Sequence, residues 1–240
     1  DITFFDTASS YGQGDSERIM GKILRSNDQI CLVTKIGKNV PLKARLLRPL
    51  KPLIRISARR SSNLGDQVKQ TRGDKLPVCF DKAYLQKKID GSRRRIGVSC
   101  IPMVMLHSPP KAVLDKGDAV DFLEDQRIKG NIRVVGVSVD DLPAAEAALN
   151  DSRVSAIQVP FHAEDWLMKC FVDRAKKAGK FVVAREIFQG VESIPAGGRA
   201  EFMQRNLQRS LMNSAVDVSL VGTINYRHLA EIIKTWKASS

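Results

Sequence analysis

The chain has 240 residues, of which 43% are apolar and 27% charged, so it can bury the core of one large α/β domain or of two small ones. Its longest apolar runs, such as 101–106 and 181–184, fall well short of the roughly 20 residues that a membrane-spanning helix needs, so we expect no transmembrane segment. The formal net charge of +13 could indicate a nucleic acid, a membrane surface or an acidic partner.

Short β-rich runs alternate with segments whose apolar residues recur at a spacing of three to four. The predicted strands are 2–5, 30–34, 101–106, 134–137, 156–159, 181–184 and 218–221. The predicted helices that follow them are 16–24, 84–96, 119–128, 142–149, 166–178, 202–212 and 228–236. The chain therefore contains seven consecutive strand-helix units.

Apolar strands joined by helices predict a parallel sheet that is buried on both faces. A doubly wound open sheet could hold seven strands, but the segment 11–17 has two glycines and lacks the third that a dinucleotide-binding turn needs. We therefore expect one domain over residues 1–240, a (β/α)8 TIM-type barrel whose first strand-helix unit is absent from the given sequence. In such barrels the catalytic residues lie at the carboxyl ends of the strands.

The segment 38–77 interrupts this alternation. Three prolines divide it, so we expect a long loop rather than a helix. The segment from Lys43 to Lys75 contains ten Lys and Arg residues and only two Asp residues, so it carries about two thirds of the excess positive charge of the chain. One interpretation is a solvated lid, and the other is a docking surface for an acidic partner or an anionic surface. The segment contains no aromatic residue for base stacking, so no nucleic acid is expected.

The four cysteines are far apart, and none forms a C-x-x-C pair or lies beside a histidine. They are Cys31, Cys79, Cys100 and Cys170. This spacing predicts no metal site and indicates reduced, mostly buried thiols in a cytoplasmic protein.

Titratable residues gather at the carboxyl ends of the first three predicted strands. Asp6 and Tyr11 follow the first strand, Lys35 ends the second, and His107 ends the third. The Lys35 ammonium, oriented by Asp6, is expected to lower the pKa of the Tyr11 phenol. A carbonyl that accepts hydride builds negative charge on its oxygen, which the Tyr11 hydroxyl and a His107 N–H could stabilise and protonate.

These residues lie in motifs that resemble the aldo-keto reductase family. The segment 4–17 reads FFDTASSYGQGDSE, which resembles the family pattern of FDTA before YG and SE. Further matches are Thr34-Lys35, the segments 92–97 and 106–107, Gly136-Val-Ser138, Gln158, the strand end 184–190, and Val221-Gly-Thr223. The resemblance covers the whole chain in order and implies hydride transfer between a nicotinamide cofactor and a small-molecule carbonyl or alcohol, a sugar carbonyl included.

Site residues follow from the resemblance by position. It implies that the catalytic tetrad is Asp6, Tyr11, Lys35 and His107. It implies that the residues in contact with the cofactor are Ser138 and Gln158 on the carboxamide, Arg185 stacked on the ring, Gly222 and Thr223 at the phosphates, and His228 and Glu231 at the adenosine. NADP is favoured over NAD because Arg227 and His228 could meet a 2′-phosphate, although NAD remains possible.

The sequence departs from the family pattern at the cofactor. Val139 and Ile232 stand where the family usually has Asn, and each change removes an amide partner. The alternative function is therefore a non-catalytic barrel that acts as a regulatory or scaffolding binding module through its basic loop. Two smaller questions also stay open: Arg185 could form ion pairs instead of stacking, and His162 has no matching role and is treated as a surface or loop residue.

Overall fold

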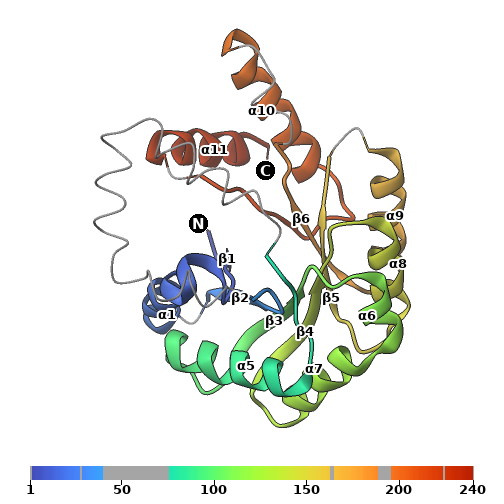
Figure 1. The fold of residues 1–240 in the computed structure, drawn as a ribbon. Coiled ribbons are helices and arrows are strands. Elements are labelled where there is room, and N and C mark those ends of the chain that lie inside the picture. The colour runs from blue at the N-terminus through green and yellow to red at the C-terminus, as the bar shows by residue number, and fades with distance from the viewer. Residues whose placement is uncertain are drawn as a thin grey trace, which may run out of the picture.

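The fold is described by a computed structural model that covers residues 2–27, 29–39, 76–162, 165–188, 196–223 and 225–239 (Figure 1). Most of the expected basic loop, residues 40–75, lies outside these ranges. Both interpretations of that loop, and the binding-module alternative that depends on it, therefore stay predictions. No helix in the described ranges is both long and apolar enough to cross a lipid bilayer.

Seven parallel strands form one sheet in which each strand pairs with the next one along the chain. The strands are β1 (Phe4–Asp6), β2 (Cys31–Ile36), β3 (Ile101–His107), β4 (Ile132–Ser138), β5 (Ala156–Pro160), β6 (Phe181–Arg185) and β7 (Val218–Ser219). The sheet curls into a nearly closed barrel with helices around its outside (Figure 1). This arrangement confirms the predicted TIM-type barrel.

A helix follows every described strand, as the apolar spacing predicted. The helices are α1 (Asp15–Ser26), α5 (Lys82–Ile96), α6 (Lys111–Lys116), α7 (Asp118–Ile128), α8 (Leu142–Asn150), α9 (Trp166–Lys177), α10 (Ala196–Leu211) and α11 (Tyr226–Ser239), with a 3-10 turn η1 (Tyr11–Gly14) before α1. The sequence prediction missed η1 and α6. Both are too short to show a helical period, and only the left-handed Gly117 separates α6 from α7.

Alternation of side chains along the strands builds two apolar layers. Outward-facing residues pack against the helices and form the larger layer, which includes Leu32, Val104, Val135, Ile157 and Val182. Inward-facing residues fill the barrel and form the smaller layer, which is Val33, Met103, Met105, Ala156 and Val183. Phe4 of β1 stacks on Phe181 of β6 inside the barrel, with ring centroids 6.1 Å apart. The interior is therefore filled by side chains at this level.

Helix α1 lies directly on the end of α5 at Gly21. A Cβ atom at this position would lie 2.7 Å from both the carbonyl carbon and the Cα of Ile96, distances that real Cβ atoms essentially never show. The close approach therefore requires glycine at residue 21.

Gly21→Ala is expected to lower the free energy of unfolding by about 1 to 3 kcal/mol, because the added methyl group has no space against the Ile96 backbone. The matched control is Gly197→Ala on α10, where no atom of the described residues lies within 4 Å of the position that the methyl group would occupy, so the change should be neutral or slightly stabilising. Urea titration of both variants measures the difference. Equal stability of Gly21→Ala and the parent chain would show that the helices separate without cost.

Candidate active site

Six inward-facing polar residues form a ring above the apolar filling of the barrel. They are Asp6, Lys35, His107, Ser138, Gln158 and Arg185, from β1 to β6 in order. Each stands at or near the carboxyl end of its strand, and the register pairs His107 with Ser138 and Ser138 with Gln158. Because all strands are parallel, these side chains meet at one end of the barrel.

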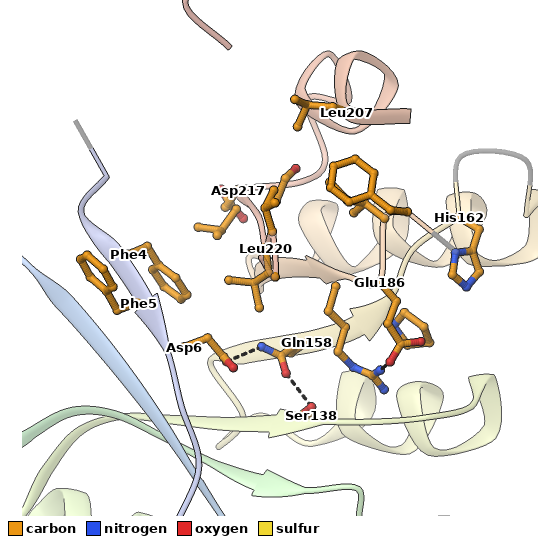
Figure 2. Close-up of a pocket in the computed structure, with 18 of the residues that line it drawn as sticks. Phe4, Phe5, Asp6, Ser138, Gln158, His162, Glu186, Leu207, Asp217 and Leu220 are labelled. Atoms are coloured by element: carbon orange, nitrogen blue, oxygen red, sulfur yellow. Dashed lines mark hydrogen bonds and ion pairs between the residues drawn. The ribbon is translucent and has the colours of Figure 1, made fainter. Parts of the chain in front are cut away.

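Four of these side chains form a continuous polar chain. Lys35 Nζ donates to Asp6 Oδ1 in an ion pair whose lysine is almost wholly buried. Gln158 Nε2 donates to Asp6 Oδ2 at 2.8 Å, and Ser138 Oγ donates to Gln158 Oε1 at 2.7 Å. Figure 2 shows Asp6, Gln158 and Ser138 in this row. Of the two residues expected at the carboxamide, Gln158 is thus bonded directly to Asp6 of the expected tetrad, and Ser138 is linked to Asp6 through Gln158.

Tyr11 joins the ring from the turn that follows β1. Backbone bonds extend the pairing of β1 past its end, with Ser9 N donating to Lys35 O at 2.9 Å, and η1 then begins at Tyr11. Lys35 Nζ lies 5.5 Å from the centroid of the Tyr11 ring. The rings of Tyr11 and His107 meet edge to face, with centroids 5.9 Å apart. The structure therefore brings together the four residues of the predicted tetrad.

The electrostatics of Tyr11 differ from the expectation. Loss of hydration, followed by the Asp6 charge, raises the pKa of Tyr11 to about 12, although 44% of the residue remains exposed at the rim. The prediction that Lys35 lowers this pKa was wrong. Lys35 is engaged by Asp6, and burial lowers the pKa of Lys35 itself. Tyr11 consequently keeps its proton throughout the neutral pH range.

His107 is held in its neutral form. Burial, together with the positive charges of Lys38, Lys35 and Arg185, lowers the pKa of His107 to about 2. Its Nδ1 atom is buried and has no hydrogen-bond partner among the described residues. A neutral imidazole carries one N–H donor and one acceptor nitrogen, so His107 can donate a hydrogen bond without bearing charge.

Arg185 is tied to the rim by acidic partners. Its Nη2 donates to Asp140 Oδ1 at 2.6 Å and to Val139 O at 2.8 Å, and its Nη1 pairs with Glu186. This is the ion-pairing arrangement that the sequence left open beside ring stacking. The Nε atom of Arg185 is buried without a partner in the described part of the chain. Glu186 has a left-handed φ of 58°, a conformation that is rare outside glycine.

A cavity of about 1590 Å³ opens over the ring. Asp6, Tyr11, Lys35, His107, Ser138, Gln158, Arg185, Gly222 and Thr223 all line it. The other two residues expected at the cofactor, His228 and Glu231, lie exposed on α11 and do not line it, whereas Ile232 does. The described residues contain no group of three or more His, Cys, Asp or Glu that could hold a metal ion. All four cysteines are free and half-buried, so they are less buried than expected.

His162 lines the cavity, a position that the sequence analysis did not assign to it. It lies in the loop after β5, as expected, but its half-buried side chain faces the cavity, and its Nδ1 atom is buried without a partner among the described residues (Figure 2). The sequence offered one signal for this position. His162 follows the carboxyl end of a strand by two residues, which is where the other site residues of the barrel lie.

The depressed pKa of His107 predicts a loss of stability in acid. Because the unfolded chain takes up a proton near pH 6.5 and the folded chain does not, lowering the pH favours unfolding. Between pH 7 and pH 5 the parent chain should lose about 2 kcal/mol more unfolding free energy than His107→Gln. Urea titrations at the two pH values measure this difference, with the exposed His228→Gln as control. Parallel behaviour of the parent chain and His107→Gln would contradict the assignment of a neutral, buried imidazole.

Comparison with known sequences gives a family and two relatives. The profile of the Aldo/keto reductase family matches residues 1–163. The chain is 24% identical over 221 residues to a pyridoxal 4-dehydrogenase from Microbacterium luteolum, which covers 84% of this chain and 62% of that protein. It is 29% identical over 164 residues to a D-threo-aldose 1-dehydrogenase from a Pseudomonas species, which covers 66% of this chain and 46% of that protein. The chain thus spans less than two thirds of the length of either relative.

Solved structures agree in fold. An aldo-keto reductase from Bacillus halodurans superposes with a TM-score of 0.72 at 19% identity, covering 98% of this chain and 76% of the other. An aldo-keto reductase from Klebsiella pneumoniae in complex with NADPH superposes with a TM-score of 0.64 at 18% identity, covering 98% and 75%. The family profile matches more than half of the chain, and the barrel with its ring of polar strand ends agrees with it. The chain therefore belongs to the aldo/keto reductase family.

Proposed function

We propose that the protein is an NAD(P)-dependent oxidoreductase that interconverts a small aldehyde, ketone or sugar carbonyl with its alcohol. The observation that carries this proposal is the meeting of Tyr11, His107 and the Asp6–Lys35 ion pair on one wall of a large cavity. The two curated relatives are named as dehydrogenases of a pyridoxal and of an aldose, which supports a small carbonyl or hydroxyl compound as the substrate.

The cavity has features that fit a nicotinamide cofactor. Ser138 and Gln158 place hydroxyl and amide groups side by side for a carboxamide, and Arg185, in the same cavity, has an Nε atom with no partner among the described residues. No atom of the described residues lies within 4 Å of the position that a Cβ at Gly222 would occupy, so phosphate groups could approach the Gly222 backbone closely. When bound, the reduced nicotinamide would supply the hydride. NADP is the favoured form because Arg227 and His228 lie exposed at the start of α11, where they could contact the 2′-phosphate that NADP has and NAD lacks.

The proposed proton chemistry follows from the two shifted groups. A phenol whose pKa is about 12 stays protonated at neutral pH, yet it is a far stronger acid than the alcohol that forms, so proton transfer from Tyr11 to the developing alkoxide is downhill. The neutral His107 N–H would stabilise the same oxygen by a hydrogen bond. It does not compete as a proton source, because a pKa of about 2 leaves His107 without its acidic, protonated form at neutral pH. The Asp6–Lys35 ion pair lies beside the Tyr11 ring and helps to hold that ring in place.

Tyr11→Phe is expected to lower the rate of carbonyl reduction by about 100-fold to 10,000-fold, because it removes the proposed proton donor. The dissociation constant of the cofactor should change little, since no cofactor contact is assigned to the hydroxyl. Steady-state assays with pyridoxal and with simple aldoses, followed by cofactor absorbance, measure the change. Tyr226→Phe, at an 83% exposed tyrosine, is the matched control. A Tyr11→Phe variant with the parent rate would remove Tyr11 from this role.

Titration with NADPH and NADH is expected to quench the protein fluorescence, because Trp236 lines the cavity. NADPH should bind more tightly than NADH, and His228→Gln with Arg227→Gln should reduce that preference by about tenfold, the effect of losing one or two charge-assisted contacts. Tighter binding of NADH would assign the protein to NAD, and equal binding would assign it to both cofactors. The absence of quenching by either one at millimolar concentration would contradict the proposed function.

A further inference from the structure

The carboxylate of Glu17 lies buried behind the wall that carries Tyr11 and Lys35. Glu17 stands in the first turn of α1, and its side chain has no exposed surface. Its Oε1 accepts a hydrogen bond from Thr34 Oγ1 at 2.6 Å, and its Oε2 accepts one from Arg95 Nε at 2.5 Å. One carboxylate therefore joins α1, β2 and α5.

The Arg95 side chain runs through space that two glycines leave open. A Cβ at Gly14 would lie 2.5 Å from Arg95 Cδ and 2.6 Å from Nε, and a Cβ at Gly91 would lie 2.8 Å from Nη1. Arg95 Nη2 also donates to Ser92 Oγ at 3.2 Å. Gly14 is the last residue of the turn that begins at Tyr11, so the arginine lies directly against that turn.

Packing of the two helices does not require this ion pair. Gly21 already places α1 against the end of α5, and apolar side chains of similar size in place of a buried ion pair usually stabilise a protein equally well or better. The ion pair instead fixes the direction of the Glu17 side chain. Glu17 is also bonded to Thr34 of β2, and the next residue of that strand, Lys35, faces the cavity on the opposite side.

The turn that carries Tyr11 needs such an anchor. Gly12, Gln13 and Gly14 have consecutive left-handed φ values of 58°, 60° and 90°, and Gln13 adopts this conformation at a cost because it is not glycine. A strained turn keeps its shape only while the structure fixes both of its ends. The Ser9 backbone bond to Lys35 fixes the first end, and the buried carboxylate of Glu17 fixes the second.

We propose that Glu17, held by Arg95 and Thr34, is a positioning residue that fixes the Tyr11 hydroxyl relative to Lys35. The effect of Glu17 on the reaction rate rests on the proposed function. The placement of Tyr11 itself does not, and it can be measured in the full chain without any assay of activity.

The experiment labels the chain with 13C at the tyrosine ζ carbon, which gives one NMR signal for each of three tyrosines. Glu17→Gln preserves size and an acceptor for Thr34 but removes the charge paired with Arg95. In this variant the Tyr11 signal should move, and its pKa should fall from about 12 toward the ordinary value near 10, because a looser turn admits water to the phenol. The signals of Tyr84 and Tyr226 should stay unchanged.

Such a fall would report on position rather than on the lost charge. The charges with the largest effects on the pKa of Tyr11 are those of Asp6, Arg185, Glu186 and Asp140, which line the cavity. The Glu17 carboxylate is instead paired with Arg95. The matched control is Glu146→Gln, which breaks an ion pair between α8 and α9 with Arg174 and should leave the Tyr11 signal in place. Assignment of the Tyr11 signal comes from Tyr11→Phe.

Kinetics supply the second measurement. Glu17→Gln should lower kcat by about tenfold or more, while the KM for the carbonyl substrate and the dissociation constant of NADPH stay within about twofold, because misplacement of the donor affects the chemical step. A folded Glu17→Gln with the parent Tyr11 signal and titration overturns the proposal. A displaced signal with an unchanged kcat overturns its consequence for the reaction.

Two further results separate the possible failures. If Glu17→Gln does not fold, Thr34→Val, which removes one donor to Glu17 and leaves the ion pair, should move the Tyr11 signal in the same direction, and an unmoved signal overturns the proposal. A parent chain that reduces no carbonyl with NADPH contradicts the proposed function instead. In that case the NMR signal alone decides whether Glu17 places Tyr11.

Discussion

The site depends on the strict alternation of side chains along parallel strands in a closed or nearly closed barrel. Each strand presents every second residue to the interior, so an inward position at or near the carboxyl end of each strand from β1 to β6 falls in one ring. Below that ring the interior is apolar, and at the ring it is polar. A slip of one residue in any strand would send its polar group into the outer apolar layer. The register of the sheet therefore determines the composition of the site.

Polar groups in this ring are buried at a cost that mutual bonding offsets. Lys35 is 2% exposed and retains a partner in Asp6, whose second oxygen accepts from Gln158. A buried group without an oppositely charged partner becomes neutral instead, and burial accordingly lowers the pKa of His107 so that its imidazole is uncharged. The ring thus separates one fixed ion pair from a neutral donor and a protonated phenol. That separation suits the proposed carbonyl reduction, in which donors that are not ionised beforehand would face an oxygen that becomes negative.

The barrel and the four residues of the tetrad could be predicted from local pattern, whereas Ser138, Gln158 and Arg185 were implied by the resemblance to the aldo-keto reductase family. Apolar runs revealed the strands, and Asp6, Lys35 and His107 stand at the ends of those runs, while Tyr11 follows in a turn with two glycines. The raised pKa of Tyr11 could not be predicted in this way. Its cause is the surrounding wall, together with Asp6, and sequence spacing does not tell how much water a wall excludes. The wall position of His162 was missed because one histidine in a loop carries no periodic signal.

The burial and hydrogen bonding of Glu17 could not be predicted from the sequence pattern either. In the sequence it follows Ser16 at the start of a helix, where an acidic residue is favoured by the helix dipole alone. Its burial and its bond to Thr34 arise only because α1 crosses β2 on the outer face of the barrel. Thr34 faces outward and Lys35 inward on consecutive positions of one strand, so the outer layer and the cavity share a single stretch of backbone. Residues of the helical layer can therefore set the geometry of the ring without touching it.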